Sequence, residues 1–109
     1  MSIENYKKYT YRVMWSEEDQ CYIGICMELP SLSVCEDTPE QALKEIEFVA
    51  SETLKWLAEE KRNIPEPLSL KRYSGKLTVR IPEEIHREIA LRSAEEGVSI
   101  NKYILSKII

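Results

Sequence analysis

Hydrophobic and polar side chains alternate along residues 8–15, which is the period of a half-buried β-strand. Residues 22–27, rich in aromatic and β-branched side chains, predict a second strand, and the polar loop between the two predicts a hairpin. Residues 32–36 predict a third, shorter strand at a sheet edge. Gly24 has no side chain to pack, so it indicates either a bulge or the close approach of another backbone. The apolar side of the first strand consists of Tyr9, Tyr11, Val13 and Trp15.

A helix is predicted to follow the three strands. Thr38 is a good cap, Pro39 suits the first helical position, and Gln41 stands where a capping box requires it. The helix is expected to end near residue 61. At 100° per residue, one apolar stripe is expected to cover a face of the sheet. Its positions are Leu43, Ile46, Val49, Ala50, Thr53 and Leu57.

Two aromatic residues of this helix fall outside the stripe. Phe48 lies almost opposite to it, and Trp56 lies on its flank. Both are therefore candidate residues for docking another protein. The alternative is that Phe48 is a single exposed aromatic side chain without a binding role, because such residues are common on protein surfaces.

Periodicity disappears at residues 63–75, which include two prolines and end on Gly75. Such a segment is typical of a linker. It predicts an N-terminal domain at residues 1–62 and a separate C-terminal unit at residues 76–109.

In the C-terminal unit, residues 76–81 predict a strand. Pro82 then begins a helix, Gly97 stands where its left-handed C-cap belongs, and Ser99 caps a second helix. A strand without a neighbour leaves its edges and apolar side open, so we predict a two-fold dimer in which two copies of the strand pair antiparallel. The apolar side, which would form the dimer core, consists of Leu77, Val79 and Ile81, and the polar side of Lys76, Thr78 and Arg80. The helix positions expected to face inward are Ile85, Ile89, Ala90, Leu91, Ala94, Ile100, Tyr103, Ile104 and Ile108.

Composition is that of a soluble globular protein, with 43% hydrophobic and 31% charged residues. The net charge of −4 is unevenly distributed. Residues 1–70 hold seven basic and fourteen acidic residues, a net −7, whereas residues 71–109 hold eight and five, a net +3. This difference indicates two surfaces with different partners, one of which could be a polyanion.

Catalytic and metal-binding patterns are not found in the sequence. The acids Glu17, Glu18 and Asp19 share one predicted loop, and His86 lies on a charged helix without a nearby nucleophile. The three cysteines fit no metal-binding spacing and are expected to be reduced. No apolar run of about 18 residues predicts a membrane span, and no signal peptide is seen. We expect a cytoplasmic protein that is not an enzyme and has no cofactor.

Four segments together resemble a known family. They are YTYRVMWSEED, YIGICMELPSLS, DTPEQAL and RYSGKLTVRIPEEIHREIALRSAEEGVSINKYI. The last resembles the ribbon-helix-helix DNA-binding domains, and the whole chain resembles HicB-type antitoxins. The resemblance implies an α+β chain with an N-terminal β-β-β-α domain of partial RNase H-like architecture. This domain would mask a HicA-type toxin, a small ribonuclease that cuts mRNA, and the C-terminal dimer would repress its own operon.

The resemblance also implies roles for particular residues. The base-facing strand residues would be Lys76, Thr78 and Arg80, and the phosphate-holding residues would be Ser99, Ile100 and Asn101. Physical chemistry supports both roles, because a two-stranded ribbon fits the major groove and a helix N-terminus attracts phosphate. The partners would be a HicA-type toxin, operator double-stranded DNA and a second copy of the chain, with higher oligomers also compatible. The alternative is a protein-interaction or scaffold module whose ribbon only dimerises and binds no DNA.

Overall fold

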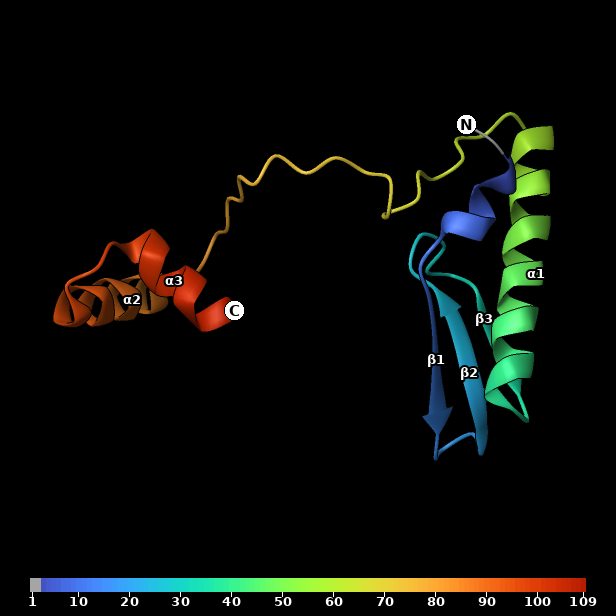
Figure 1. The fold of residues 1–109 in the computed structure, drawn as a ribbon, viewed down its shortest axis with the longest axis horizontal. Helices are drawn as coiled ribbons and strands as arrows, with labels where there is room; N and C mark the ends of the chain where they lie inside the picture. Colours follow the sequence, from blue (N-terminus) through green and yellow to red (C-terminus); the bar gives the residue numbers. More distant parts are fainter. Residues whose placement is uncertain (1–2) are drawn as a thin grey trace. The chain divides into compact units, whose positions relative to one another are not determined.

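The chain is an α+β protein, and its computed structural model describes residues 3–109. These residues divide into two units, the first ending at Tyr73 and the second beginning at Ser74. The first unit holds the strands and the longest helix, and the second holds two shorter helices (Figure 1). In chain order the elements are η1 (Ile3–Lys8), β1 (Tyr11–Ser16), β2 (Cys21–Cys26), β3 (Ser33–Glu36), α1 (Pro39–Glu59), α2 (Glu83–Glu96) and α3 (Ile100–Ile108).

The three strands form one antiparallel sheet in the order β1-β2-β3, which confirms the predicted hairpin and third strand. The ladder between β1 and β2 continues through Gly24, which stands opposite Val13 without an extra residue on either strand. A Cβ built at Gly24 would lie only 2.8 Å from the carbonyl oxygen of Ala42 in α1. Gly24 therefore marks the close approach of another backbone and not a bulge.

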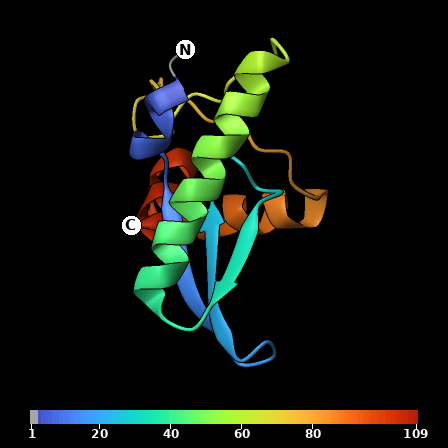
Figure 2. The same ribbon diagram turned by 90° about the vertical axis from the view of Figure 1, so that its right-hand side faces the viewer.

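Helix α1 covers one face of the sheet, as Figure 2 shows. It begins as predicted, because the N–H of Gln41 donates to the Thr38 hydroxyl at 3.1 Å. The expected inward position of Leu43 is wrong, since this side chain is exposed. The helix is rotated so that the small Ala42 lies over Gly24, and this turns Leu43 toward solvent. The fully buried residues of α1 are Ala42, Ile46, Ala50 and Leu54.

The opposite face of the sheet contacts no other described element of the first unit. Because side chains alternate along a strand, this face carries the residues that do not point toward α1. We name it the open face. Its side chains are Arg12, Met14, Ser16, Cys21, Ile23, Ile25, Ser33 and Cys35.

Residues 65–70 lie within the expected linker but are held against the first unit, and we name this segment the strap. Pro67 is buried, and the Tyr9 hydroxyl donates to the carbonyl oxygen of Pro65 at 2.6 Å. Burial raises the pKa of Tyr9 to about 12, so its hydroxyl stays protonated and remains a donor at neutral pH.

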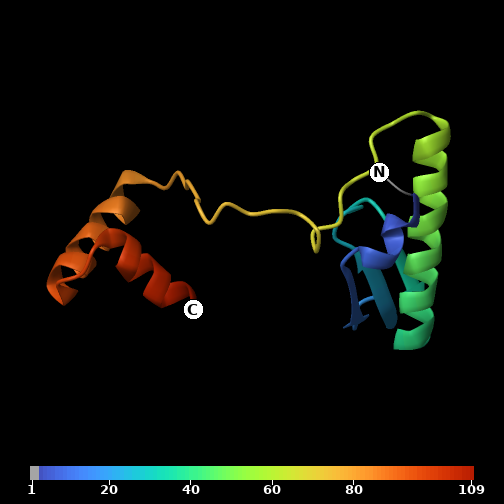
Figure 3. The ribbon, with the colours of Figure 1, turned by 45° about the horizontal axis from the view of Figure 1, so that its top comes forward.

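In the second unit, α2 and α3 meet at a short turn (Figure 3). Gly97 ends α2 in the left-handed conformation, with φ 69°, and Ser99 caps α3, as predicted. Tyr103 is buried and Ile89 and Ala90 are half-buried. The remaining positions expected to face inward are exposed, and these are Ile85, Leu91, Ala94, Ile100, Ile104 and Ile108. No helix within residues 3–109 is long and apolar enough to cross a membrane.

Candidate functional site

The predicted DNA-contacting strand, residues 76–81, is exposed along its whole length and is not a strand in the single chain. A strand requires a hydrogen-bonded neighbour, and the described residues of one copy provide none. The strand was predicted as one half of a ribbon formed by two copies, so it stays a prediction. The single chain leaves exposed both the apolar set Leu77, Val79 and Ile81 and the polar set Lys76, Thr78 and Arg80.

The three residues predicted to hold phosphate come together at the exposed N-terminus of α3. The hydroxyl oxygen of Ser99 accepts a hydrogen bond from the N–H of Lys102 at 3.0 Å. Ile100 and Asn101 form the first turn, where backbone N–H groups have no partner within the helix and carry partial positive charge. This helix end can therefore bind an anion such as phosphate.

The second unit exposes far more apolar surface than it buries. Tyr103 is 6% exposed and is its only buried large apolar side chain, whereas Leu77 is 85% exposed. A unit of this size cannot be stable on so small a core. The exposed apolar side chains are Leu77, Val79, Ile81, Ile85, Leu91, Ile100, Ile104, Leu105, Ile108 and Ile109.

The two candidate docking residues of α1 are both exposed, Phe48 at 57% and Trp56 at 48%. The Arg62 guanidinium lies 5.4 Å from the centre of the Trp56 ring, a distance at which a cation is attracted to an aromatic face. Phe48 has no such neighbour among the described ring contacts.

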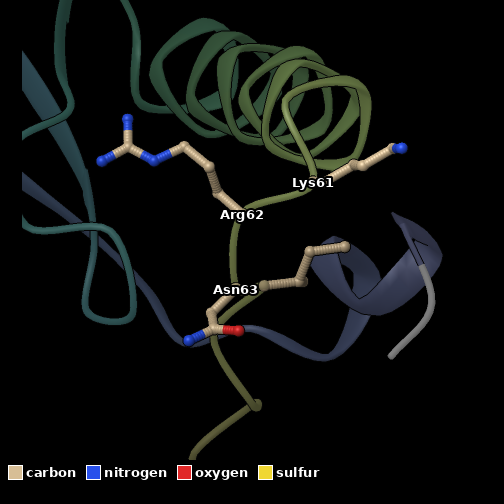
Figure 4. Close-up of a pocket in the computed structure, with 4 residues that line it drawn as sticks. Lys61, Arg62 and Asn63 are labelled. Carbon is tan, nitrogen blue, oxygen red and sulfur yellow. The ribbon is translucent and has the colours of Figure 1, made fainter.

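A hollow of about 560 Å³ follows the end of α1, lined by Lys61, Arg62, Asn63 and Ile64. The side chains of Lys61 and Arg62 point to opposite sides of the chain (Figure 4). They do not converge on a common point, so the hollow has no evident anion-binding geometry. Within residues 3–109 no three His, Cys, Asp or Glu side chains are grouped as metal ligands.

Glu28 forms a structural contact that the sequence patterns did not reveal. Its carboxylate accepts hydrogen bonds from the N–H of Thr10 at 2.9 Å and from the N–H of Leu68 in the strap at 2.9 Å. Burial alone would raise the pKa of Glu28, but the hydrogen bonds from Leu68 and Thr10 lower it below the ordinary value. Glu28 therefore joins the end of β2 to the strap as a carboxylate.

The expectation of three reduced cysteines is wrong. Cys21 and Cys35 are joined by a disulfide between β2 and β3, with their Cα atoms 5.8 Å apart. Cys26 is the free cysteine of the described residues and is buried beneath α1, which raises the pKa of its thiol. Spacing alone did not show the pair, because the two partners are fourteen residues apart and meet only through strand pairing.

Comparison with known proteins found one family that is similar to the C-terminal part of the chain. The HicB family model matches residues 58–108. The match covers the end of α1, the strap and both helices of the second unit, and it includes the exposed segment 76–81. Comparison with curated proteins and with solved structures gave no match. The similarity to the HicB family therefore lies in the C-terminal half of the chain.

Proposed function

We propose that this chain is an antitoxin, which binds and neutralises a HicA-type mRNA interferase toxin and, as a homodimer, represses its own operon by binding operator DNA. The first unit would hold the toxin and the second would hold DNA. Neither task requires a catalytic group, a metal or a cofactor from this chain.

The observation that carries this proposal is the exposed apolar surface of the second unit, in the region similar to the HicB family. Antiparallel pairing of two copies of residues 76–81 would give each segment its missing hydrogen-bond partners. The same pairing would place Leu77 and Val79 on one side of the ribbon. There they could cover exposed helix residues such as Ile85 and Ile104.

The other side of such a ribbon supports DNA binding. Lys76, Thr78 and Arg80 would all face outward, and a two-stranded ribbon fits the major groove. Arg80 could donate to guanine O6 and N7, and Thr78 could contact a thymine methyl group. The exposed N-terminus of α3 would hold a phosphate and set the register on the duplex. The net charge of +3 in residues 71–109 favours a polyanion.

The first unit supports binding of a basic protein. A toxin that cuts mRNA has to attract phosphate, so its RNA-binding surface is basic. Residues 1–70 carry a net charge of −7, which favours association with such a surface.

The proposal is tested by mobility-shift titration of the chain's own promoter duplex over a range of salt concentrations. We expect a specific complex whose log affinity falls linearly with log salt concentration. Arg80→Ala should weaken it about tenfold or more. Arg12→Ala, which removes an exposed arginine from the open face of the first unit, is the matched control and should change affinity less than about twofold.

The alternative is a protein-interaction or scaffold module whose ribbon only dimerises. The exposed apolar surface of the second unit is compatible with it as well. It predicts a dimer in sedimentation that binds the promoter duplex no better than an unrelated duplex. That result would refute the repressor role and leave the scaffold role.

A further inference from the structure

Helix α1 carries an exposed stripe of alternating acidic and aromatic side chains. The spacing of these residues is three or four, so they lie along one side of the helix, away from the buried Ile46 and Ala50. We name this set the acidic-aromatic stripe. It consists of Glu45, Phe48, Glu52, Trp56 and Glu59.

The stripe is not covered by any described part of the first unit. Phe48 and Trp56 lie about 12 Å apart along the helix axis, at 1.5 Å per residue, and both rings are open to solvent. Glu52 and Glu59 are exposed and Glu45 is half-buried. Two large exposed aromatic rings on one side of one helix are a common feature of binding surfaces, where tryptophan is enriched.

Three cations border the stripe. Lys44, which is exposed, lines a hollow together with Glu45. Lys55 pairs with Glu52 at 3.2 Å, and Arg62 lies against the Trp56 ring. The Lys55–Glu52 pair is exposed on both sides, and exposed pairs contribute little, so a partner's cation could replace Lys55. Glu45 and Glu59 take part in no ion pair found among residues 3–109.

We propose that the acidic-aromatic stripe is the surface that docks the basic toxin, by occupying the toxin's RNA-binding surface. This inference rests on the proposed function. A protein that binds RNA offers cations to phosphates and flat apolar or aromatic faces to bases. The stripe offers carboxylates and aromatic rings in alternation. Its carboxylates can pair with the toxin's cations, and its rings can pack against the toxin's flat apolar or aromatic faces. Toxin bound in this way is excluded from RNA by direct competition.

The open face of the sheet is another uncovered surface of the first unit, and it fits a basic partner less well. Its eight side chains include no carboxylate, and its one charged residue is Arg12. Its apolar residues Ile23 and Ile25 are half-buried, and Met14, at 43%, is less exposed than Trp56 or Phe48. Charge complementarity therefore selects the stripe.

The experiment measures the affinity of the full chain for a small basic HicA-type toxin protein, by calorimetry at two salt concentrations. Trp56→Ala and Phe48→Ala should each raise Kd about 30-fold, as central aromatic contacts do. A triple variant with Glu45→Gln, Glu52→Gln and Glu59→Gln should raise Kd about tenfold and reduce its salt dependence. Because the side chains are exposed or nearly isosteric, thermal unfolding should be unchanged.

The controls are Met14→Ala on the open face and the matched acidic triple Glu40→Gln, Glu60→Gln and Glu66→Gln, all exposed positions outside the stripe.

The possible results distinguish failure of the proposed antitoxin function from failure of the proposed docking surface. If the wild-type chain does not bind the basic protein, the proposed antitoxin function is overturned. If the wild-type chain binds but both aromatic variants bind within about twofold of it, the stripe is not the docking surface and only this inference fails. Loss of binding in Met14→Ala would instead place the toxin on the open face. RNA added in excess should displace the toxin from the wild-type chain, and binding of RNA and this chain at the same time would contradict direct competition.

Discussion

The backbone of Gly24 in β2 lies directly beneath the carbonyl group of Ala42 in α1, so that a Cβ added at Gly24 would stand 2.8 Å from that oxygen. Side-chain carbons of Val34 and Ile46 would lie 3.0 and 3.2 Å from this added Cβ. The helix can approach the sheet this closely only because position 24 has no side chain. This contact sets the distance between the two layers of the first unit.

Replacing Gly24 by alanine should therefore destabilise the first unit. The added methyl group meets backbone, which cannot move aside as a flexible side chain can, so α1 must shift outward. We expect Gly24→Ala to lower the free energy of unfolding by about 1–3 kcal/mol in urea denaturation. Ser33→Ala, at an exposed position of the neighbouring strand β3, is the control and should change stability by less than about 0.5 kcal/mol. Equal stability of Gly24→Ala and wild type would show that α1 can move away from the sheet without cost, and would contradict this prediction.

Glu28 should make stability depend on pH. Its pKa is lower in the folded chain than the ordinary value of 4.5, so the ionised carboxylate stabilises the fold at pH values above 4.5. This contribution is lost as pH falls through the lower folded value. At pH 7, Glu28→Gln should therefore lower the free energy of unfolding by about 1–2 kcal/mol, because charged hydrogen bonds to Thr10 and Leu68 are replaced by weaker ones. The difference should shrink toward pH 3. The exposed Glu66→Gln is the control, and a constant difference across pH would contradict the assigned role.

The disulfide should contribute measurably to stability. Cys21 and Cys35 close a loop of fourteen residues, for which the chain-entropy relation gives about 3 kcal/mol, commonly reduced in practice. We expect dithiothreitol, or Cys35→Ser, to lower the free energy of unfolding by about 2–3 kcal/mol. Thiol titration of the unfolded, unreduced chain should find one free thiol, that of Cys26. Three free thiols before reduction would exclude the disulfide.

Two helices end at residues with the same left-handed backbone conformation, one with a side chain and one a glycine, so substitutions there should change stability in opposite directions. Lys61, after α1, has a positive φ of 55°, and Gly97, after α2, has a φ of 69°. A Cβ is unfavourable in this region and glycine is not. Lys61→Gly should therefore raise the free energy of unfolding of the first unit by about 0.5–1 kcal/mol. Gly97→Ala should lower the melting temperature of the second unit, although no atom lies within 4 Å of the added Cβ. Calorimetry measures both, and effects of equal sign would contradict this reading.

Local signals predicted much of the fold, whereas contacts between distant residues were missed. The caps at Thr38, Gly97 and Ser99 were found because a cap depends on neighbouring residues. The strap was read as free linker because its attachment depends on Glu28, forty residues away from Leu68. No periodicity within either segment contains that information.

One further misreading has the same origin. The orientation of Leu43 depends on which residue lies over Gly24, and this is decided by contact between two elements and not by helical spacing alone. For residues 76–81, the alternation predicts an apolar and a polar set, and this stays a prediction because a strand forms only with a second strand. At the candidate site, the sequence named Phe48 and Trp56, whereas the carboxylates that join them into one stripe became apparent only once the buried side of α1 was known.

Adjacent positions of residues 76–81 should respond in opposite ways to the same substitution. In the proposed ribbon, Val79 belongs to the dimer core, and an aspartate there would bury an unpaired charge. Val79→Asp should therefore give the mass of one chain, 12.7 kDa, in sedimentation equilibrium, where wild type gives twice that mass. Thr78→Asp places the same charge on the outer side, so the dimer should persist while phosphate repulsion abolishes the promoter complex. If Thr78→Asp dissociates the dimer and Val79→Asp does not, the ribbon has the opposite side inward, and Lys76 and Arg80 cannot be its DNA contacts.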